Sequence, residues 1–323
     1  MPSVSLLRLL LGMAVTLGSG AACAQESVCP GTSLALNTSI QDAPYVAIRL
    51  GVREGNFLVD TGATASSVDA RAFGLAPGSR TTIEGSSFPT LAGGDFAVLD
   101  WSHVLAPPGG LSGVIGTDVL SLRVVEFHYD APAHFLAAST GPCPADRLAA
   151  AGFIAVSQEG YYSADPRRLP AGRPNIPVMF IRIGPVIAPA QIDSGFNEWG
   201  RVRGVVQINE ALLRDLQDAG VAMSADPTVA FTVTDCHGRE FAPQVWRVQA
   251  SPLEMTTREG ETLFAYEPPL LEIKSASGDC GGIGTSPAAM GQIGALYLER
   301  WGTLILDPFN ARVWVRKAIS SRP

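Results

Sequence analysis

Two aspartates of this chain lie in the same local pattern, and together they could perform acid–base chemistry. Each is followed by a hydroxyl residue and a glycine, in Asp60-Thr61-Gly62 and Asp193-Ser194-Gly195. Glycine at this place permits a tight turn that presents the carboxylate. Two carboxyl groups about 3 Å apart cannot both ionise, so such a pair holds one proton. The ionised member can take a proton from water while the other protonates a carbonyl oxygen, which is a route to hydrolysis.

The segments around the two aspartates also repeat. An apolar segment ends at Gly51 or Gly184, and a second apolar segment then runs into the aspartate at the same distance from that glycine. Strand, short connection and strand is the pattern of a β-hairpin. Further on, Gly113–Gly116 and Gly291–Gly294 share the form Gly-x-Ile-Gly, and each leads into a short helical stretch and a strand. The chain is therefore predicted to consist of two diverged halves, each of which contributes one aspartate.

These residues resemble the aspartic peptidases. Asp60-Thr61-Gly62-Ala63 is similar to the retroviral type, while two copies of the motif in one chain are similar to the two-lobed pepsin type. The resemblance implies an all-β fold of two pseudo-symmetric pepsin/retropepsin-like β-barrel lobes with a few short helices. It also implies an aspartic endopeptidase, a hydrolase of peptide bonds that needs neither a metal nor an organic cofactor.

The resemblance assigns roles to the motif residues. Asp60 and Asp193 would form the catalytic pair. Thr61 and Ser194 would each hold the opposite loop by hydroxyl-to-backbone hydrogen bonds. The remaining residues of the two turns would support the pair; they are Gly62, Ala63 and Gly195. The expected partner is a peptide or protein substrate, and the expected oligomeric state is a monomer.

The second motif departs from the family's pattern, and two alternatives stay open. Phe196 stands where the family usually has a small residue, and Asn197-Glu198 differ as well. One alternative is a non-catalytic relative that keeps the cleft and binds peptide. The other is a homodimer that pairs Asp60 with its symmetry mate and uses the second half as a scaffold. Because neither Ala63 nor Phe196 has a hydroxyl to donate to a carboxylate, we expect raised pKa values for the pair.

The amino terminus has the features of an export signal. Residues 1–24 carry one charge, Arg8, followed by an apolar run and the small residues Ala22-Cys23-Ala24. A short apolar run before an Ala-x-Ala site is typical of a secretory signal peptide. Lipid attachment at Cys23 is the alternative. We expect a periplasmic or secreted protein, with no later segment that spans a membrane.

Removal of residues 1–24 would leave four cysteines. An even number in an exported chain indicates disulfides, although four cysteines allow three pairings. We favour one bridge in each half, Cys29–Cys143 and Cys236–Cys280. The four histidines are scattered and no two cysteines have the spacing of metal ligands, so no metal site is expected.

Composition and charge point to an ordered, turn-rich β protein. The chain has 34 glycines and 24 prolines between short apolar runs, and charged residues make up 16% of it. A net charge of −7 disfavours nucleic acid and anionic membranes as partners. The predicted divisions are a signal peptide (1–24), an N-terminal segment (25–42), an N-terminal lobe (43–141), a linker (142–177) and a C-terminal lobe (178–323).

The pattern of short apolar runs predicts strands in both halves. The resemblance to a pepsin-like lobe implies a hairpin flap over the site, for which residues 83–95 are the candidate. One helix is predicted after Asn209, which can cap it. The predicted strands of the first half are Tyr45–Leu50, Asn56–Val59, Thr81–Ile83, Phe96–Trp101, Arg123–Tyr129 and His134–Ala138. Those of the second half are Val178–Ile183, Ala190–Ile192, Val229–Thr234, Val245–Ala250, Leu263–Tyr266, Leu270–Ile273, Thr303–Leu306 and Val313–Arg316.

Overall fold

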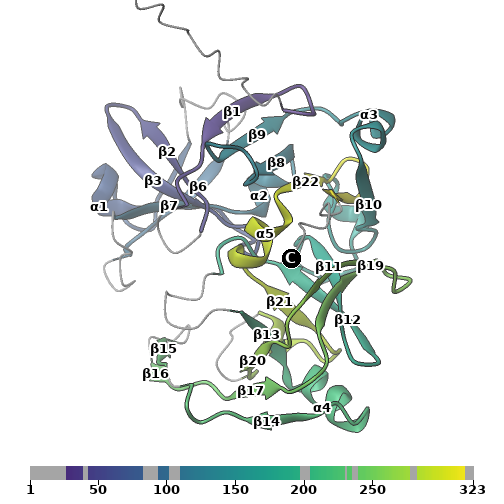
Figure 1. Cartoon of the computed structure of the whole chain (residues 1–323). Helices are drawn as coiled ribbons and strands as arrows, with labels where there is room; N and C mark the ends of the chain where they lie inside the picture. Colours follow the sequence, from purple (N-terminus) through teal and green to yellow (C-terminus); the bar gives the residue numbers. More distant parts are fainter. Residues whose placement is uncertain are drawn as a thin grey trace, which may run out of the picture.

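Strands dominate the computed structural model, and they curl into several sheets joined by short helices (Figure 1). The expectation of a mostly β fold is confirmed at this level. The structure describes residues 27–38, 43–82, 94–101, 110–196, 204–229, 231–234, 239–276 and 282–316. The expected flap falls mostly in 83–93, outside the described residues. Within the described ranges, no helix has the length and apolar character needed to cross a membrane.

The elements have the following bounds. The strands of the first half are β1 (Thr32–Ala35), β2 (Tyr45–Leu50), β3 (Arg53–Val59), β4 (Ser67–Asp69), β5 (Arg80–Thr82), β6 (Asp95–Leu99), β7 (Leu111–Ile115), β8 (Val124–His128) and β9 (Phe135–Ser139). Those that follow are β10 (Phe153–Ser157), β11 (Val178–Ile183), β12 (Val186–Ile192), β13 (Val205–Asn209), β14 (Met223–Ala225), β15 (Val233–Thr234), β16 (Glu240–Phe241), β17 (Val245–Val248), β18 (Leu253–Thr256), β19 (Thr262–Tyr266), β20 (Leu270–Lys274), β21 (Gly291–Ile293), β22 (Thr303–Asp307) and β23 (Arg312–Arg316). The helices are α1 (Ala70–Phe73), α2 (Thr117–Leu120), α3 (Ala145–Ala150), α4 (Glu210–Asp218), α5 (Ala295–Trp301) and the 3₁₀ turns η2 (Pro166–Arg168) and η3 (Ile283–Thr285).

The first half forms a six-stranded sheet in the order β2-β3-β7-β4-β6-β5. Along this order the pairings are antiparallel, parallel, antiparallel, parallel and antiparallel. The second half contains a nine-stranded sheet whose stretch β11-β12-β21-β13-β20-β17 repeats the same succession of pairings. Strands β18, β19 and β14 extend it at its ends. The two halves therefore repeat one topology, as the repeated sequence segments predict.

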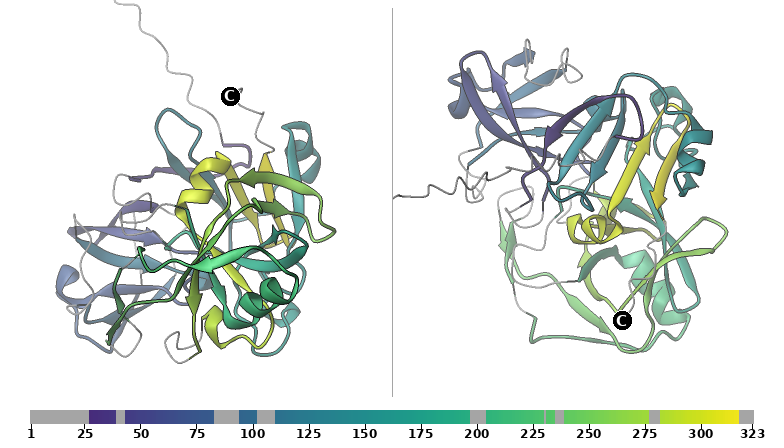
Figure 2. Two further views of the ribbon diagram at one scale, coloured as in Figure 1. Left: turned by 60° about the horizontal axis from the view of Figure 1, so that its bottom comes forward. Right: turned by 45° about the horizontal axis from the view of Figure 1, so that its top comes forward.

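A third sheet is built jointly by both halves, in the order β1-β9-β8-β22-β23-β10. Its two central strands come one from each half, and they pair antiparallel with Phe127 opposite Leu304. Every residue of β8 and of β22 is buried. Figure 2 shows the yellow C-terminal strands beside the teal strands of the first half. This sheet fixes the two halves relative to each other.

Apolar side chains from both halves join in one large core. In β3 and β12, Val59 and Ile192 are fully buried just before the strands end at Asp60 and Asp193. Strand β22 is buried along its whole length, so both of its faces are covered, and its central residues Leu304–Leu306 are all apolar. Helix α4 begins as predicted, because Asn209 accepts a hydrogen bond from the Leu212 N–H at 2.9 Å.

Residues 142–177 are more than the predicted linker. They contain helix α3 and strand β10, which pairs with β23 at the edge of the shared sheet. Phe153 and Val156 of β10 are buried. The prolines elsewhere in 142–177 are the reason that the sequence predicts a linker here. Gln158 then joins the segment to β11, donating to the Val178 carbonyl at 2.6 Å and accepting from its N–H at 2.7 Å.

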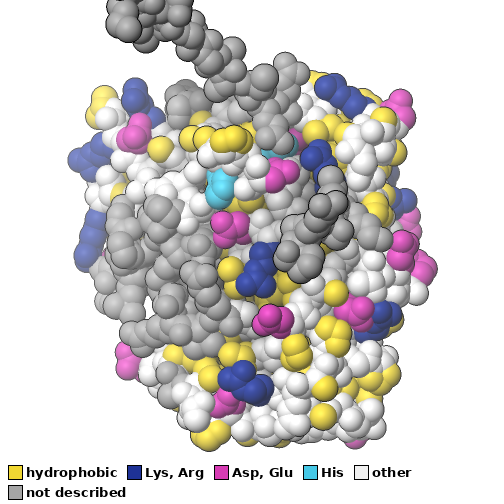
Figure 3. Space-filling model, viewed as in Figure 1, with side chains coloured by type: hydrophobic (Ala, Val, Ile, Leu, Met, Phe, Trp, Pro, Cys, Tyr) yellow, Lys and Arg dark blue, Asp and Glu magenta, His cyan; other side chains and the backbone are white. Residues whose placement is uncertain are grey.

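Several short strands differ from the sequence prediction. The sequence predictions contain no counterpart of β1, β4, β7, β10, β13, β14, β16, β18 and β21, and the described residues of the predicted strand 229–234 form only β15. The missed strands are two to five residues long, so their pairing partners decide their conformation more than their own periodicity does. Figure 3 shows that acidic and basic side chains are interspersed on the described part of one face.

The N-terminal segment is tied to the shared sheet by covalent and polar bonds. The predicted disulfide Cys29–Cys143 is confirmed. Beside it, the buried carboxylate of Glu126 accepts hydrogen bonds from the Ser27 hydroxyl at 2.6 Å and the Cys29 N–H at 2.8 Å. Cys236 and Cys280, the second predicted bridge, lie outside the described residues.

The disulfide generates a stability prediction. Replacing both cysteines, Cys29→Ala with Cys143→Ala, should lower the free energy of unfolding by about 2–5 kcal/mol, because the bridge closes a long loop in the unfolded chain. Urea unfolding of the mature protein measures this. Intact masses before and after reduction, with peptide mapping, test both bridges. Unchanged stability in the double variant would contradict the structural role.

Candidate active site

Asp60 stands where β3 ends, and the backbone holds it from both sides. Its N–H donates to the Ile115 carbonyl at the end of β7, at 3.0 Å. Its Oδ1 accepts hydrogen bonds from the N–H groups of Gly62 at 2.8 Å and Ala63 at 3.0 Å. A carboxylate that accepts backbone N–H groups of its own turn is fixed in orientation. The strand end and the turn together therefore aim the Asp60 carboxyl group.

Asp193 stands in the equivalent place at the end of β12. Its N–H donates to the Ile293 carbonyl of β21 at 2.9 Å. Its Oδ1 accepts from the N–H groups of Gly195 at 2.9 Å and Phe196 at 2.8 Å. The two aspartates are thus held by the same backbone contacts, as expected from the repeated topology.

The hydroxyl residues of the two motifs brace the turns against each other. The Thr61 hydroxyl donates to the Ile192 carbonyl at 2.7 Å, and the Ser194 hydroxyl donates to the Val59 carbonyl at 2.6 Å. In return, the Ser194 N–H donates to the Thr61 hydroxyl at 3.0 Å, and the Thr61 N–H donates to the Ser194 hydroxyl at 3.0 Å. Both side chains are fully buried. We refer to this set of bonds as the cross-brace.

The glycines of the motifs let the two carboxyl groups meet. A Cβ added to Gly62 would lie 2.3 Å from Asp193 Cγ, and one added to Gly195 would lie 2.3 Å from Asp60 Cγ. Any larger residue would push the opposite aspartate away. The carboxyl groups of Asp60 and Asp193 are hydrogen-bonded to each other. One chain therefore brings together all the residues that the sequence singled out.

Burial and mutual repulsion control the charge of the pair. Both aspartates are partly buried, so each keeps a side open to solvent. Burial raises the pKa of Asp60, while hydrogen bonds from Asp193 and from backbone N–H groups oppose the rise. Burial and the adjacent Asp60 charge raise the pKa of Asp193 well above its ordinary value. The two carboxyl groups therefore titrate as one coupled pair that holds a proton above the ordinary aspartate pKa.

One residue of the site was missed by the sequence reasoning. Gln292, in β21, donates from Nε2 to Asp193 Oδ2 at 2.7 Å. The signal that could have found it is the repeat itself, because Val114 holds the equivalent place in Gly113–Gly116. Asp193 thus has a side-chain donor although Phe196 offers none.

Phe196, which follows Gly195, packs into the second half of the chain. Its ring packs against the apolar side chains of Val205, Val245 and Leu270 in the second half. Its carbonyl accepts the Ala295 N–H at 2.9 Å, which holds the start of α5. The ring therefore forms part of the second half's surface beside Asp193.

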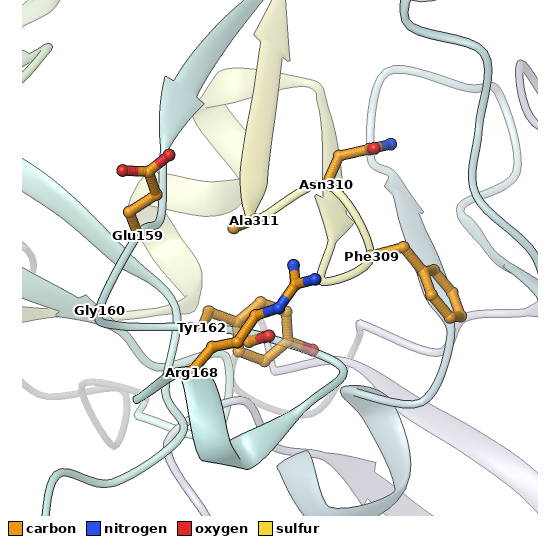
Figure 4. Close-up of a pocket in the computed structure, with 8 residues that line it drawn as sticks. Glu159, Gly160, Tyr162, Arg168, Phe309, Asn310 and Ala311 are labelled. Carbon is orange, nitrogen blue, oxygen red and sulfur yellow. The ribbon is translucent and has the colours of Figure 1, made fainter. Parts of the chain in front are cut away.

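One pocket among the described residues lies away from the aspartates. It has a volume of about 510 Å³, and Figure 4 shows Glu159 and Asn310 on opposite sides of it. Its lining is Glu159, Gly160, Tyr162, Ser163, Arg168, Phe309, Asn310 and Ala311. The paired carboxyl groups do not contribute to it, so it is a separate feature. Within the described ranges, no cluster of three or more His, Cys, Asp or Glu side chains could hold a metal ion.

Comparison with known proteins adds no relative to these observations. No family model matches the chain, and no curated protein matches it.

The cross-brace generates a first prediction for the site. Thr61→Val removes a buried hydroxyl that donates to the Ile192 carbonyl and accepts from the Ser194 N–H, and should cost about 1–3 kcal/mol of unfolding free energy. Thr256→Val is the matched control. Thr256 is equally buried, but its hydroxyl lies 3.5 Å from its acceptor, the Phe180 carbonyl. Urea unfolding should show a clearly larger loss for Thr61→Val, and equal losses would contradict the cross-brace.

The raised pKa of Asp193 generates a second prediction. The pKa of the Asp193 carboxyl group is higher in the folded state than in the unfolded state. Its contribution to the free energy of unfolding is therefore complete at pH values below the ordinary aspartate pKa, and is lost as pH rises through the raised pKa. Asn cannot ionise, so Asp193→Asn should become progressively more stable than the wild type as pH rises. Unfolding free energies measured over a pH series test this.

Asp226 provides the control of opposite sign. Hydrogen bonds from Thr228 and Arg247 lower its pKa. The loss of unfolding free energy caused by Asp226→Asn should therefore be present at neutral pH and disappear as pH falls through that lowered pKa. If Asp193→Asn showed the same pH dependence as Asp226→Asn, the Asp193 carboxyl would be an ordinary ion-stabilised group.

Proposed function

We propose that the chain is an exported aspartic endopeptidase that hydrolyses peptide bonds with a water activated between Asp60 and Asp193. The observation that supports this most is the meeting of two carboxyl groups from equivalent strand ends within one chain. The cross-brace and the hydrogen bond between the carboxyl groups give the pair the fixed geometry that proton sharing requires.

The proposed architecture is that of two pseudo-symmetric pepsin/retropepsin-like lobes, 43–141 and 178–323. Its support is the repeated succession of pairings in the two half-sheets and the sheet that both halves share. In this arrangement the two turns meet on the approximate twofold axis between the halves. Export, with a signal peptide over 1–24, would place the enzyme in the periplasm or outside the cell.

The proposed reaction follows from the charge of the pair. Ionised Asp60 takes a proton from the water, whose oxygen bonds to the carbonyl carbon of the substrate. Asp193 gives its proton to the carbonyl oxygen, and a tetrahedral diol forms. The C–N bond then breaks as the amide nitrogen receives the proton held by Asp60, and a diol hydroxyl returns its proton to Asp193. Each carboxyl group ends the cycle as it began.

The two alternatives differ in their relation to the structure. A homodimer that pairs two copies of Asp60 would have to separate Asp60 from Asp193 and break the cross-brace. A non-catalytic peptide-binding protein would keep the same pair and is distinguished only by activity. The intramolecular pair therefore favours a monomer as the working unit.

Substitution of either aspartate tests the proposal. Asp60→Asn and Asp193→Asn should each reduce hydrolysis of an unfolded protein substrate by about 10³-fold or more, because either change ends proton sharing. Mass spectrometry of the peptide products, measured from acid to neutral pH, gives the rate. The control is Asp226→Asn, which should keep the activity.

Three results would contradict the proposal in different ways. No cleavage by the mature wild type at any pH would favour the peptide-binding alternative. Full activity of Asp193→Asn, with none for Asp60→Asn, would favour the homodimer. Full activity of both variants would place the chemistry elsewhere in the chain.

A further inference from the structure

A row of polar side chains runs across the second half-sheet from Asp193. Register partners on neighbouring strands place Gln191 of β12 beside Gln292 of β21, Gln292 beside Gln207 of β13, and Gln207 beside Glu272 of β20. Side chains of register partners share one face of a sheet. The alternating residues of the same strands, such as Ile192 and Ile293, point into the core. The row therefore lies on the face opposite to the core.

The first half carries no such row. The equivalent register partners there are Leu58, Val114, Ser67 and Ala97, of which three are apolar and one is a small hydroxyl residue. A buried amide or carboxylate is costly unless it is hydrogen-bonded, and the fold does not require one at these places. The polar row is thus a property of the second half alone, next to Asp193.

Three members of the row form a directed relay of hydrogen bonds. Gln207 donates from Nε2 to Glu272 Oε2 at 3.1 Å. Its Oε1 accepts from Gln292 Nε2 at 2.9 Å, and Gln292 Nε2 also donates to Asp193 Oδ2 at 2.7 Å. Glu272 Oε2 acts as an acceptor in this set of bonds. Glu272 therefore orients Gln207, and Gln207 orients Gln292, so that Gln292 presents N–H rather than C=O to Asp193.

From this relay we infer that Gln292, oriented by Gln207 and Glu272, is a positioning residue that holds Asp193 Oδ2 and stabilises the carboxylate that Asp193 becomes when it gives up its proton. The catalytic part of the inference depends on the proposed peptidase function. Asp193 Oδ1 already accepts two backbone N–H groups, so Oδ2 is the oxygen best able to carry the shared proton. The N–H of Gln292 occupies one side of Oδ2 and leaves the other side for that proton.

The other ionisable groups around the pair are few. Among the described residues, Asp60 faces Asp193 directly, and Glu272 faces it through the relay. Tyr45 of β2 is close to Asp60, and burial together with the Asp60 charge raises its pKa to about 12. Tyr45 therefore stays neutral while the pair titrates. A pH shift caused by a change at Gln292 can accordingly be assigned to the aspartates.

Gln292→Met tests the inference, because methionine is close to glutamine in size but has no donor. In the folded variant the Asp193 carboxylate loses a hydrogen bond, so its pKa should rise by about one unit. Carboxyl ¹³C NMR of Asp-labelled protein measures this directly, with signals assigned from Asp60→Asn and Asp193→Asn. Glu272→Gln, which replaces one accepting oxygen beside Gln207 with an amide, should shift the Asp193 signal in the same direction by a smaller amount.

Gln191→Met is the matched control for the titration. Gln191 lies in the same row beside Gln292 but makes no hydrogen bond to the aspartates among the described contacts, so the Asp193 signal should titrate as in the wild type. Gln292→Val, which copies Val114 of the first half, replaces Gln292→Met if that variant does not fold. An unmoved Asp193 titration in the folded Gln292 variants would overturn the inference.

Kinetics supply the second readout. Gln292→Met should lower kcat about tenfold or more with little change in KM, and move the alkaline limb of the pH–rate profile to higher pH. Gln292→Glu can donate only while protonated, so its activity should be confined to acid pH. A rise in KM alone, with both limbs of the pH–rate profile unchanged, would contradict a positioning role for Gln292. Because the NMR titration needs no substrate, it judges the role of Gln292 even if the wild type proves not to hydrolyse peptides.

Discussion

Two carboxyl groups held side by side and partly out of water impose the constraint on which this structure depends. They repel each other when both are ionised, so the pair is stable only with a shared proton. Nothing in one short turn could hold them there alone. The N–H groups of each turn bind the Oδ1 atoms, the cross-brace locks the turns together, and the glycines remove the side chains that would separate the aspartates.

The repeated topology of the two halves brings the aspartates together, and the differences between the halves give the two aspartates different surroundings. Equivalent strands β3 and β12 bring equivalent aspartates to one place, and the shared sheet built around β8 and β22 keeps the halves in register. Equal environments would give the aspartates equal roles. Instead, Gln292 donates to Asp193, while the apolar Val114 holds the place of Gln292 in the first half. Two half-sheets of the same topology thus hold two aspartates that have different hydrogen-bond partners.

Local sequence signals predicted the parts of the site that are encoded locally. The Asp-Thr-Gly and Asp-Ser-Gly turns, the flanking hairpins and the capped helix after Asn209 each depend on a few adjacent residues. The Cys29–Cys143 bridge followed from cysteine number and position. Strand β10 and the relay from Gln292 to Glu272 were missed, because they depend on which strands become neighbours and in which register. Periodicity within one short strand carries no information about that pairing.

The most direct test of the account is a count of the protons held by the pair. Potentiometric titration of the folded wild type, minus that of the folded Asp60→Asn/Asp193→Asn double variant, measures the protons bound to the two carboxyl groups as pH changes. The ordinary pKa of an aspartate is about 4, so two independent aspartates would hold no proton at pH values well above it. The account predicts one bound proton there. A difference of zero over that range would mean that both carboxyl groups are ionised, and would contradict proton sharing by Asp60 and Asp193.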